Sequence, residues 1–217
     1  MTTSQGKVVA VTIASKSAKK WSTLLAPAPL KHAHTHMVIK NASPGVMEEQ
    51  ITKGLRMLKD GDILVFNSHA NEDYFVYGHA NKKVDWSDIW KHFAVKNPPR
   101  LSAVIIASCM APRDKKLSRS KLRDLNAIFN SGMIVAPHST YEYHFFGGTK
   151  DNRTADNIIA DILLFAGNEI SRAEFNQRIH RDQDRFAASY GCNGWNHPGN
   201  CRCRFGPNAS RDKKPGP

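Results

Sequence analysis

Compact apolar runs alternate with amphipathic stretches along most of this chain. The runs are short and rich in β-branched residues, as buried strands are, and they occupy residues 7–14, 36–41, 63–68, 101–108 and 133–137. Their nearly continuous apolar content indicates burial on both faces, as in a parallel sheet. The pattern predicts a doubly wound α/β domain within residues 1–170, followed by a C-terminal helix and a basic, Cys/His-containing tail over residues 171–217.

The stretches between the apolar runs carry helical periodicity. It predicts helices over residues 44–58, 85–93, 122–132 and 155–167, and a last one from Ser171. Pro44 suits the first turn of the first helix, and Asp85 is the expected cap of the second. Gly132 is expected to end the third helix, and the sequence SRAE at Ser171 has the form of a capping box.

The charge of the chain bears on its partners rather than on its fold. It holds 31 Lys and Arg against 19 Asp and Glu, a net charge of +12. Such a field attracts nucleic acids, phosphates and acidic proteins. The basic residues cluster at 112–123 and again after Ser171, so a solvated basic surface and a dedicated anion or nucleic-acid site both remain open interpretations.

The apolar runs also bear on location. None is long enough to cross a bilayer, and no apolar segment with a cleavage site follows the first lysine. We therefore expect a cytoplasmic protein that has no membrane partner.

Two of the predicted strands end in side chains that suit catalysis. One run stops at Ser68 and His69, and the next strand stops at Ser108 and Cys109. The separation, 109 minus 69, is 40 residues and holds the helix and strand of a crossover, so we expect neighbouring strands about 4.8 Å apart. An imidazole at this edge could take the proton of the thiol. Taken singly, a buried thiol and a hydrogen-bonded histidine at the rim fit equally well.

The order of these segments resembles the caspase-like cysteine peptidases. The sequences that carry the resemblance are KDGDILVFNSHA, VDWSDIWKHF and LSAVIIASC, followed by NIIADILLFAGNEISRAEF, which is similar to the helix and Gly turn after the fifth strand of bacterial CHAT proteases. The resemblance covers about residues 5–170 and implies a caspase-like, Rossmann-like three-layer sandwich with a mostly parallel central sheet. It implies a cysteine endopeptidase that needs no cofactor for catalysis, with His69 as base or proton donor and Cys109 as nucleophile.

The resemblance also implies an oxyanion site and a substrate site. The oxyanion donors would be the backbone amides of Cys109 and Ala70, although most members of the family have Gly where this chain has Ala70. Metacaspase-like members that cleave after Lys or Arg hold the basic side chain with acids, and here Asp73 or Glu142 would serve. By topology, the residues after the fifth strand would line the same crevice: His138, Ser139, Tyr141 and Glu142.

The resemblance implies a protein or peptide substrate. Small bacterial proteins that resemble this one often serve in defence or regulated cell death, and some are switched on by a nucleotide or a partner. A nucleotide or other anionic activator would suit the basic surface. The alternative is a Rossmann-like protein whose basic loop and tail bind nucleic acid or a nucleotide, with Cys109 only structural. A cysteine hydrolase of small amides is a third interpretation.

Histidines and cysteines cluster in two further places. Near the C-terminus, the spacing C-x4-H-x3-C-x-C offers four ligands that suit a structural, tetrahedral zinc ion: Cys192, His197, Cys201 and Cys203. This is not a standard zinc-finger spacing, so exposed thiols in a basic tail remain the alternative. In HAHTH, His32, His34 and His36 would share one face of an extended strand, either solvated or around a metal.

Overall fold

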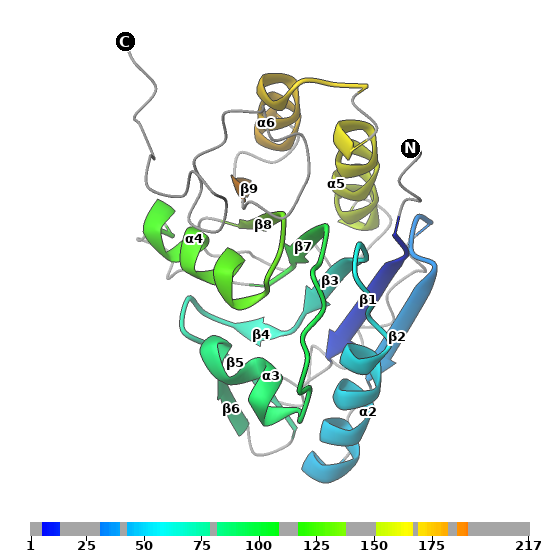
Figure 1. The fold of residues 1–217 in the computed structure, drawn as a ribbon, viewed down its shortest axis with the longest axis vertical. Helices are drawn as coiled ribbons and strands as arrows, with labels where there is room; N and C mark the ends of the chain where they lie inside the picture. Colours follow the sequence, from blue (N-terminus) through cyan, green and yellow to red (C-terminus); the bar gives the residue numbers. More distant parts are fainter. Residues whose placement is uncertain are drawn as a thin grey trace.

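The described residues of the computed structural model form a six-stranded sheet with helices on both faces (Figure 1). The structure describes residues 6–13, 31–39, 43–78, 82–108, 117–137, 151–166, 169–181 and 186–190. The strand order is β2-β1-β3-β7-β8-β9. The predicted α/β class with a mostly parallel central sheet is therefore confirmed.

The five predicted strands are all present and run parallel to one another. They are β1 (Val8–Ile13), β2 (Thr35–Ile39), β3 (Ile63–Asn67), β7 (Ala103–Ile106) and β8 (Met133–Pro137). A sixth strand, β9 (Phe186–Tyr190), pairs antiparallel with β8 at the edge of the sheet. This strand was not predicted.

Helices cover the two faces of the sheet and bury two apolar clusters. In β3, Leu64 and Phe66 face the side of α2 (Pro44–Arg56), α3 (Ile89–His92) and α4 (Arg119–Ile128). Ile63 and Val65 face the other side, where α5 (Asp151–Ala166) and α6 (Arg172–Arg181) lie. Because strand side chains alternate, a strand that is apolar throughout is buried between two helical layers.

A small antiparallel sheet lies between β3 and β7 in the chain. It consists of β4 (His69–Ala70), β5 (Tyr74–Tyr77) and β6 (Lys82–Asp85), in that order. The helix predicted over residues 85–93 is confirmed only in part, because residues 86–92 are helical but do not form a single α-helix. Asp85 ends β6 and makes no side-chain cap, and it is followed by a 3-10 helix, η1 (Trp86–Asp88), and then by the short α3.

The predicted helix ends are partly confirmed. Pro44 lies in the first turn of α2, and Ser171 Oγ accepts a hydrogen bond from the backbone N–H of Glu174 at 3.1 Å. The prediction that α4 ends at Gly132 is wrong, because Asn130 takes the left-handed backbone conformation, with φ of 48°, two residues earlier. Asparagine tolerates this conformation better than most residues, so glycine is not needed there.

The C-terminal helix packs on the domain. The rings of Phe165 in α5 and Phe175 in α6 stack with their centroids 5.3 Å apart, and Arg178 pairs with Asp161 at 3.1 Å. No helix in the described segments has the length and apolar character that crossing a membrane requires.

Candidate active site

The strands that precede His69 and Cys109 are direct neighbours. Residues of β3 and β7 pair in parallel, with Ile63 opposite Ala103 and Phe66 opposite Ile106. The offset of this register, 106 minus 66, is 40, which equals the sequence separation of His69 and Cys109. The predicted crossover between neighbouring strands is thus confirmed. Cys109 itself lies outside the described residues.

The two strands separate at the carboxyl edge of the sheet. The last ladder bond runs from the backbone N–H of Ala107 to the carbonyl of Phe66, at 2.8 Å. One step further, the N–H of Ser68 donates to the side-chain hydroxyl of Ser108 at 3.2 Å, and both serines are buried. The hydroxyl replaces a backbone carbonyl of the ladder, so β3 can leave β7 and turn into β4 without an unsatisfied amide.

Ser108→Ala is expected to lower the free energy of unfolding by about 1–3 kcal/mol, because it leaves the buried N–H of Ser68 without an acceptor. Urea denaturation measures this change. Ser108→Thr keeps the hydroxyl and should lose less, and Ser102→Ala makes the same substitution near the other end of β7 as a control. A Ser108→Ala protein within 0.5 kcal/mol of the parent would contradict the role of this hydrogen bond.

His69 begins β4 and is half-buried. It pairs with Val76 of β5, and its Nε2 atom is closed to solvent. Burial lowers the pKa of His69 below its ordinary value, because the charged imidazolium loses hydration. The imidazole is therefore neutral near pH 7, which is the form that can accept a proton from a thiol.

The turn after Ala70 is held by several hydrogen bonds. The side-chain oxygen of Asn71 accepts from the N–H groups of Asp73 and Tyr74, at 2.8 and 2.9 Å. The indole N–H of Trp86 donates to the carbonyl of Asn71 at 2.8 Å. The backbone next to His69 and Ala70 is thus tied to a buried side chain of the core.

Asp73 lies on this turn and is exposed. Its carboxylate forms an ion pair with Lys121 of α4, with Oδ1 2.7 Å from Nζ. The ion pair bridges the β4–β5 turn and the first turn of α4. The other residues predicted to bind substrate lie outside the described part of the chain: His138, Ser139, Tyr141 and Glu142.

Sequence reasoning missed a polar layer at the carboxyl edge of the sheet. Thr12 of β1 lies opposite Asn67 of β3, and both are buried on the α5 and α6 side. Thr12 shares a hydrogen bond of 3.0 Å with the ring of His36. Asn67 Oδ1 and Ser68 Oγ are buried and bond to none of the residues that the structure describes. A polar residue near the end of an apolar run was the available signal, and buried polar atoms of this kind call for water or a ligand.

The metal predictions have different outcomes. The tail cluster of Cys192, His197, Cys201 and Cys203 lies outside the described residues, so structural zinc stays a prediction. Within the described part of the chain, no group of three or more His, Cys, Asp and Glu side chains could hold a metal ion.

The prediction that His32, His34 and His36 share a strand face is wrong. Only His36 lies in β2, whereas His32 lies in a turn and His34 in a bend before it. His34 Nδ1 also accepts a hydrogen bond from the N–H of Val8 at 3.0 Å, so this nitrogen is occupied by the backbone.

Comparisons with known proteins give structural likeness but no match by sequence. No protein-family model matches the chain, and no curated protein sequence matches it. Among solved structures, the fold is similar to that of caspase-1 from Spodoptera frugiperda, with a TM-score of 0.42, 12% identity, and coverage of 86% of this chain and 87% of that one. At this level of similarity, the function has to be inferred from the residues themselves.

Proposed function

We propose that this chain is a caspase-like cysteine endopeptidase in which His69 is the base and Cys109 the nucleophile. The hydrogen bond from the Ser68 N–H to the Ser108 hydroxyl carries the proposal. It holds the residue before His69 against the residue before Cys109 at the edge where the two strands part. Consecutive Cα atoms are about 3.8 Å apart, so a thiol on the residue after Ser108 would start near the imidazole on the residue after Ser68.

The chemistry follows from a neutral imidazole beside a thiol. His69 takes the thiol proton, and the thiolate attacks the carbonyl carbon of the scissile peptide bond. When the C–N bond breaks, the imidazolium gives its proton to the leaving amine, and the acyl group remains on sulfur as a thioester. Water then attacks the thioester with His69 as base, which releases the acid and restores the thiol.

Backbone amides would stabilise the oxyanion of each tetrahedral intermediate. The N–H of Asn71 donates to the carbonyl of Tyr74 at 2.9 Å, which makes this a hydrogen-bonded pair of the hairpin. Such pairs alternate in antiparallel ladders, so the amide of Ala70, opposite Phe75, faces away from β5. It is thereby available as a donor, together with the amide of Cys109.

Asp73 supports a preference for substrates with a basic side chain. The carboxylate of Asp73 is 62% exposed and its Lys121 partner is 32% exposed, and ion pairs of this kind contribute little stability. The lysine or arginine of a protein or peptide substrate could therefore take the place of Lys121. This would make Lys121 an internal competitor of the substrate.

A peptidyl chloromethyl ketone with arginine next to the reactive carbon tests the proposal. We expect mass spectrometry to locate the adduct on Cys109, with no adduct there in Cys109→Ala and slower labelling in His69→Ala. Alkylation only at Cys192, Cys201 or Cys203 would overturn the proposal. Salt-dependent oligonucleotide binding that is unchanged in Cys109→Ala, without labelling at position 109, would favour a nucleic-acid-binding protein instead.

A further inference from the structure

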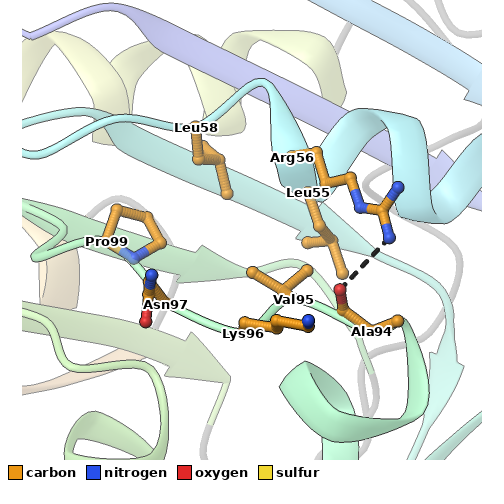
Figure 2. Close-up of a pocket in the computed structure, with 8 residues that line it drawn as sticks. All are labelled: Leu55, Arg56, Leu58, Ala94, Val95, Lys96, Asn97 and Pro99. Carbon is orange, nitrogen blue, oxygen red and sulfur yellow. Dashed lines mark hydrogen bonds between the residues drawn. The ribbon is translucent and has the colours of Figure 1, made fainter.

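A cavity, whose lining is shown in Figure 2, lies near the start of β3, at the edge of the sheet opposite the one that leads to His69. It forms where α2 ends and where residues 94–100 lead from α3 toward β7, and its volume is about 370 Å³. Its lining residues are Leu55, Arg56, Leu58, Ala94, Val95, Lys96, Asn97 and Pro99. Apolar side chains form most of the lining, and no lining residue is acidic.

Two cations belong to this lining. The guanidinium of Arg56 donates from Nη2 to the carbonyl of Ala94 at 3.2 Å, the dashed line in Figure 2, which holds it beside the cavity. Ala94 adopts the left-handed backbone conformation, with φ of 50°, and so presents this carbonyl after the end of α3. Among the described residues, neither Arg56 nor Lys96 forms an ion pair with a carboxylate.

We propose that this cavity binds a small amphipathic anion, in which a carboxylate, sulfonate or phosphate is joined to an apolar body. The apolar body would cover Ala94, Val95 and Pro99, which are exposed or half-buried, and would exclude water from them. The anionic group would pair with Arg56 and Lys96, to which the described part of the chain offers no carboxylate partner. The cavity volume lies at the lower end of the range for ligand pockets, about 300–1,000 Å³.

The two halves of the lining explain why both parts of the ligand are needed. An inorganic anion would leave the apolar wall in water, and a neutral hydrocarbon would leave the two cations unpaired. Because the cavity lies at the edge of the sheet away from His69, the proposal does not depend on peptidase activity.

Titration with 8-anilinonaphthalene-1-sulfonate, followed by its fluorescence, tests the proposal. We expect saturable binding at one site, weakened at least tenfold in a double variant with Arg56→Gln and Lys96→Gln. The matched control, Lys53→Gln with Lys91→Gln, removes the same charge from α2 and α3 outside the cavity and should change the Kd less than threefold. The neutral analogue N-phenyl-1-naphthylamine should bind the parent protein at least tenfold more weakly.

A single charge reversal keeps the test valid if the double variant is unstable. Lys96 is exposed, and Lys96→Glu leaves the Arg56 hydrogen bond intact, so it should also weaken binding at least tenfold, whereas Lys53→Glu should not. Equal weakening in cavity and control variants would overturn the proposal, because a general positive field would then explain binding. Unchanged binding in the cavity variants, or equal affinity for the neutral analogue, would overturn it as well.

Discussion

Replacing Cys109 with alanine is expected to reduce peptide hydrolysis to the uncatalysed background, because no other group forms the thioester. Replacing His69 with glutamine removes the proton acceptor and should lower kcat by about 10²–10⁴-fold, the usual contribution of acid–base catalysis. KM should change little, since neither side chain is expected to bind the distal parts of the substrate. Steady-state assays with an arginyl fluorogenic peptide measure both constants.

The pH dependence provides a second readout for the same variants. Protonation of His69 removes the base, so kcat/KM falls at acid pH, and the lowered pKa places this fall below the ordinary histidine value of about 6.5. The free energy of unfolding should also fall at acid pH. As pH falls below about 6.5, His69 binds a proton in the unfolded chain before it does so in the folded chain. The free energy of unfolding therefore decreases.

His69→Gln should abolish the stability loss that is due to this residue, and it should remove the acid limb of the rate profile. The control is His92→Gln, since His92 lies in α3 in contact with Tyr77 and belongs to another polar cluster. An acid limb and a stability profile that His69→Gln leaves unchanged would show that another group titrates, and His69 would lose its role as the base.

The parallel sheet could be predicted because its strands carry their own signal. A run such as residues 63–66 is apolar at every position, and only a strand buried on both faces needs that. Neighbouring placement of β3 and β7 followed from the length of the chain between them. His69 follows β3 at the carboxyl edge that β3 and β7 share, as the sequence predicted.

The small sheet and β9 carry weaker signals. Tyr74–Tyr77 alternates buried and half-buried positions over only four residues, and the four residues of β6 have one buried member. The helical periodicity of residues 86–93 is a stronger signal than the short strand patterns of β5 and β6, because Trp86, Ile89, Trp90 and Phe93 fall at helical spacing. All four are buried, but Trp86 lies in η1, Ile89 and Trp90 lie in α3, and Phe93 follows the end of α3.

The details of the candidate site could not be predicted from the sequence, because they depend on contacts between distant segments. Ser108 acts on the backbone of Ser68, 40 residues away, and no local pattern encodes the point at which two strands separate. The lowered pKa of His69 depends on its burial in the folded protein. Residue types thus predicted the chemistry, whereas the hydrogen bonds and burial that tune it depend on contacts between distant segments.

Trp86→Ala is expected to give the largest loss of stability, about 3–5 kcal/mol, which is the usual cost of removing a large aromatic side chain from a core. Trp86 is 1% exposed, and its ring centroid lies 5.6 Å from that of Phe66, 5.0 Å from Phe75 and 5.8 Å from Phe129. These rings join β3, β5 and the end of α4. Since domains of this size are stable by only about 5–15 kcal/mol, urea denaturation should resolve the change clearly.

Trp86→Phe distinguishes the role of Trp86 in packing the core from its role in positioning the turn after Ala70. It keeps an aromatic ring in the cluster but removes the hydrogen bond to the carbonyl of Asn71, which fixes the turn after His69 and Ala70. We expect slower hydrolysis from this loosened turn, beyond any loss of stability. Trp90→Phe is the matched control, because its indole donates to the carbonyl of Ile128 at 2.7 Å, away from that turn. If both variants retain full activity per folded molecule, Trp86 stabilises the core without positioning the candidate site, and the catalytic geometry depends on β3 and β7 alone.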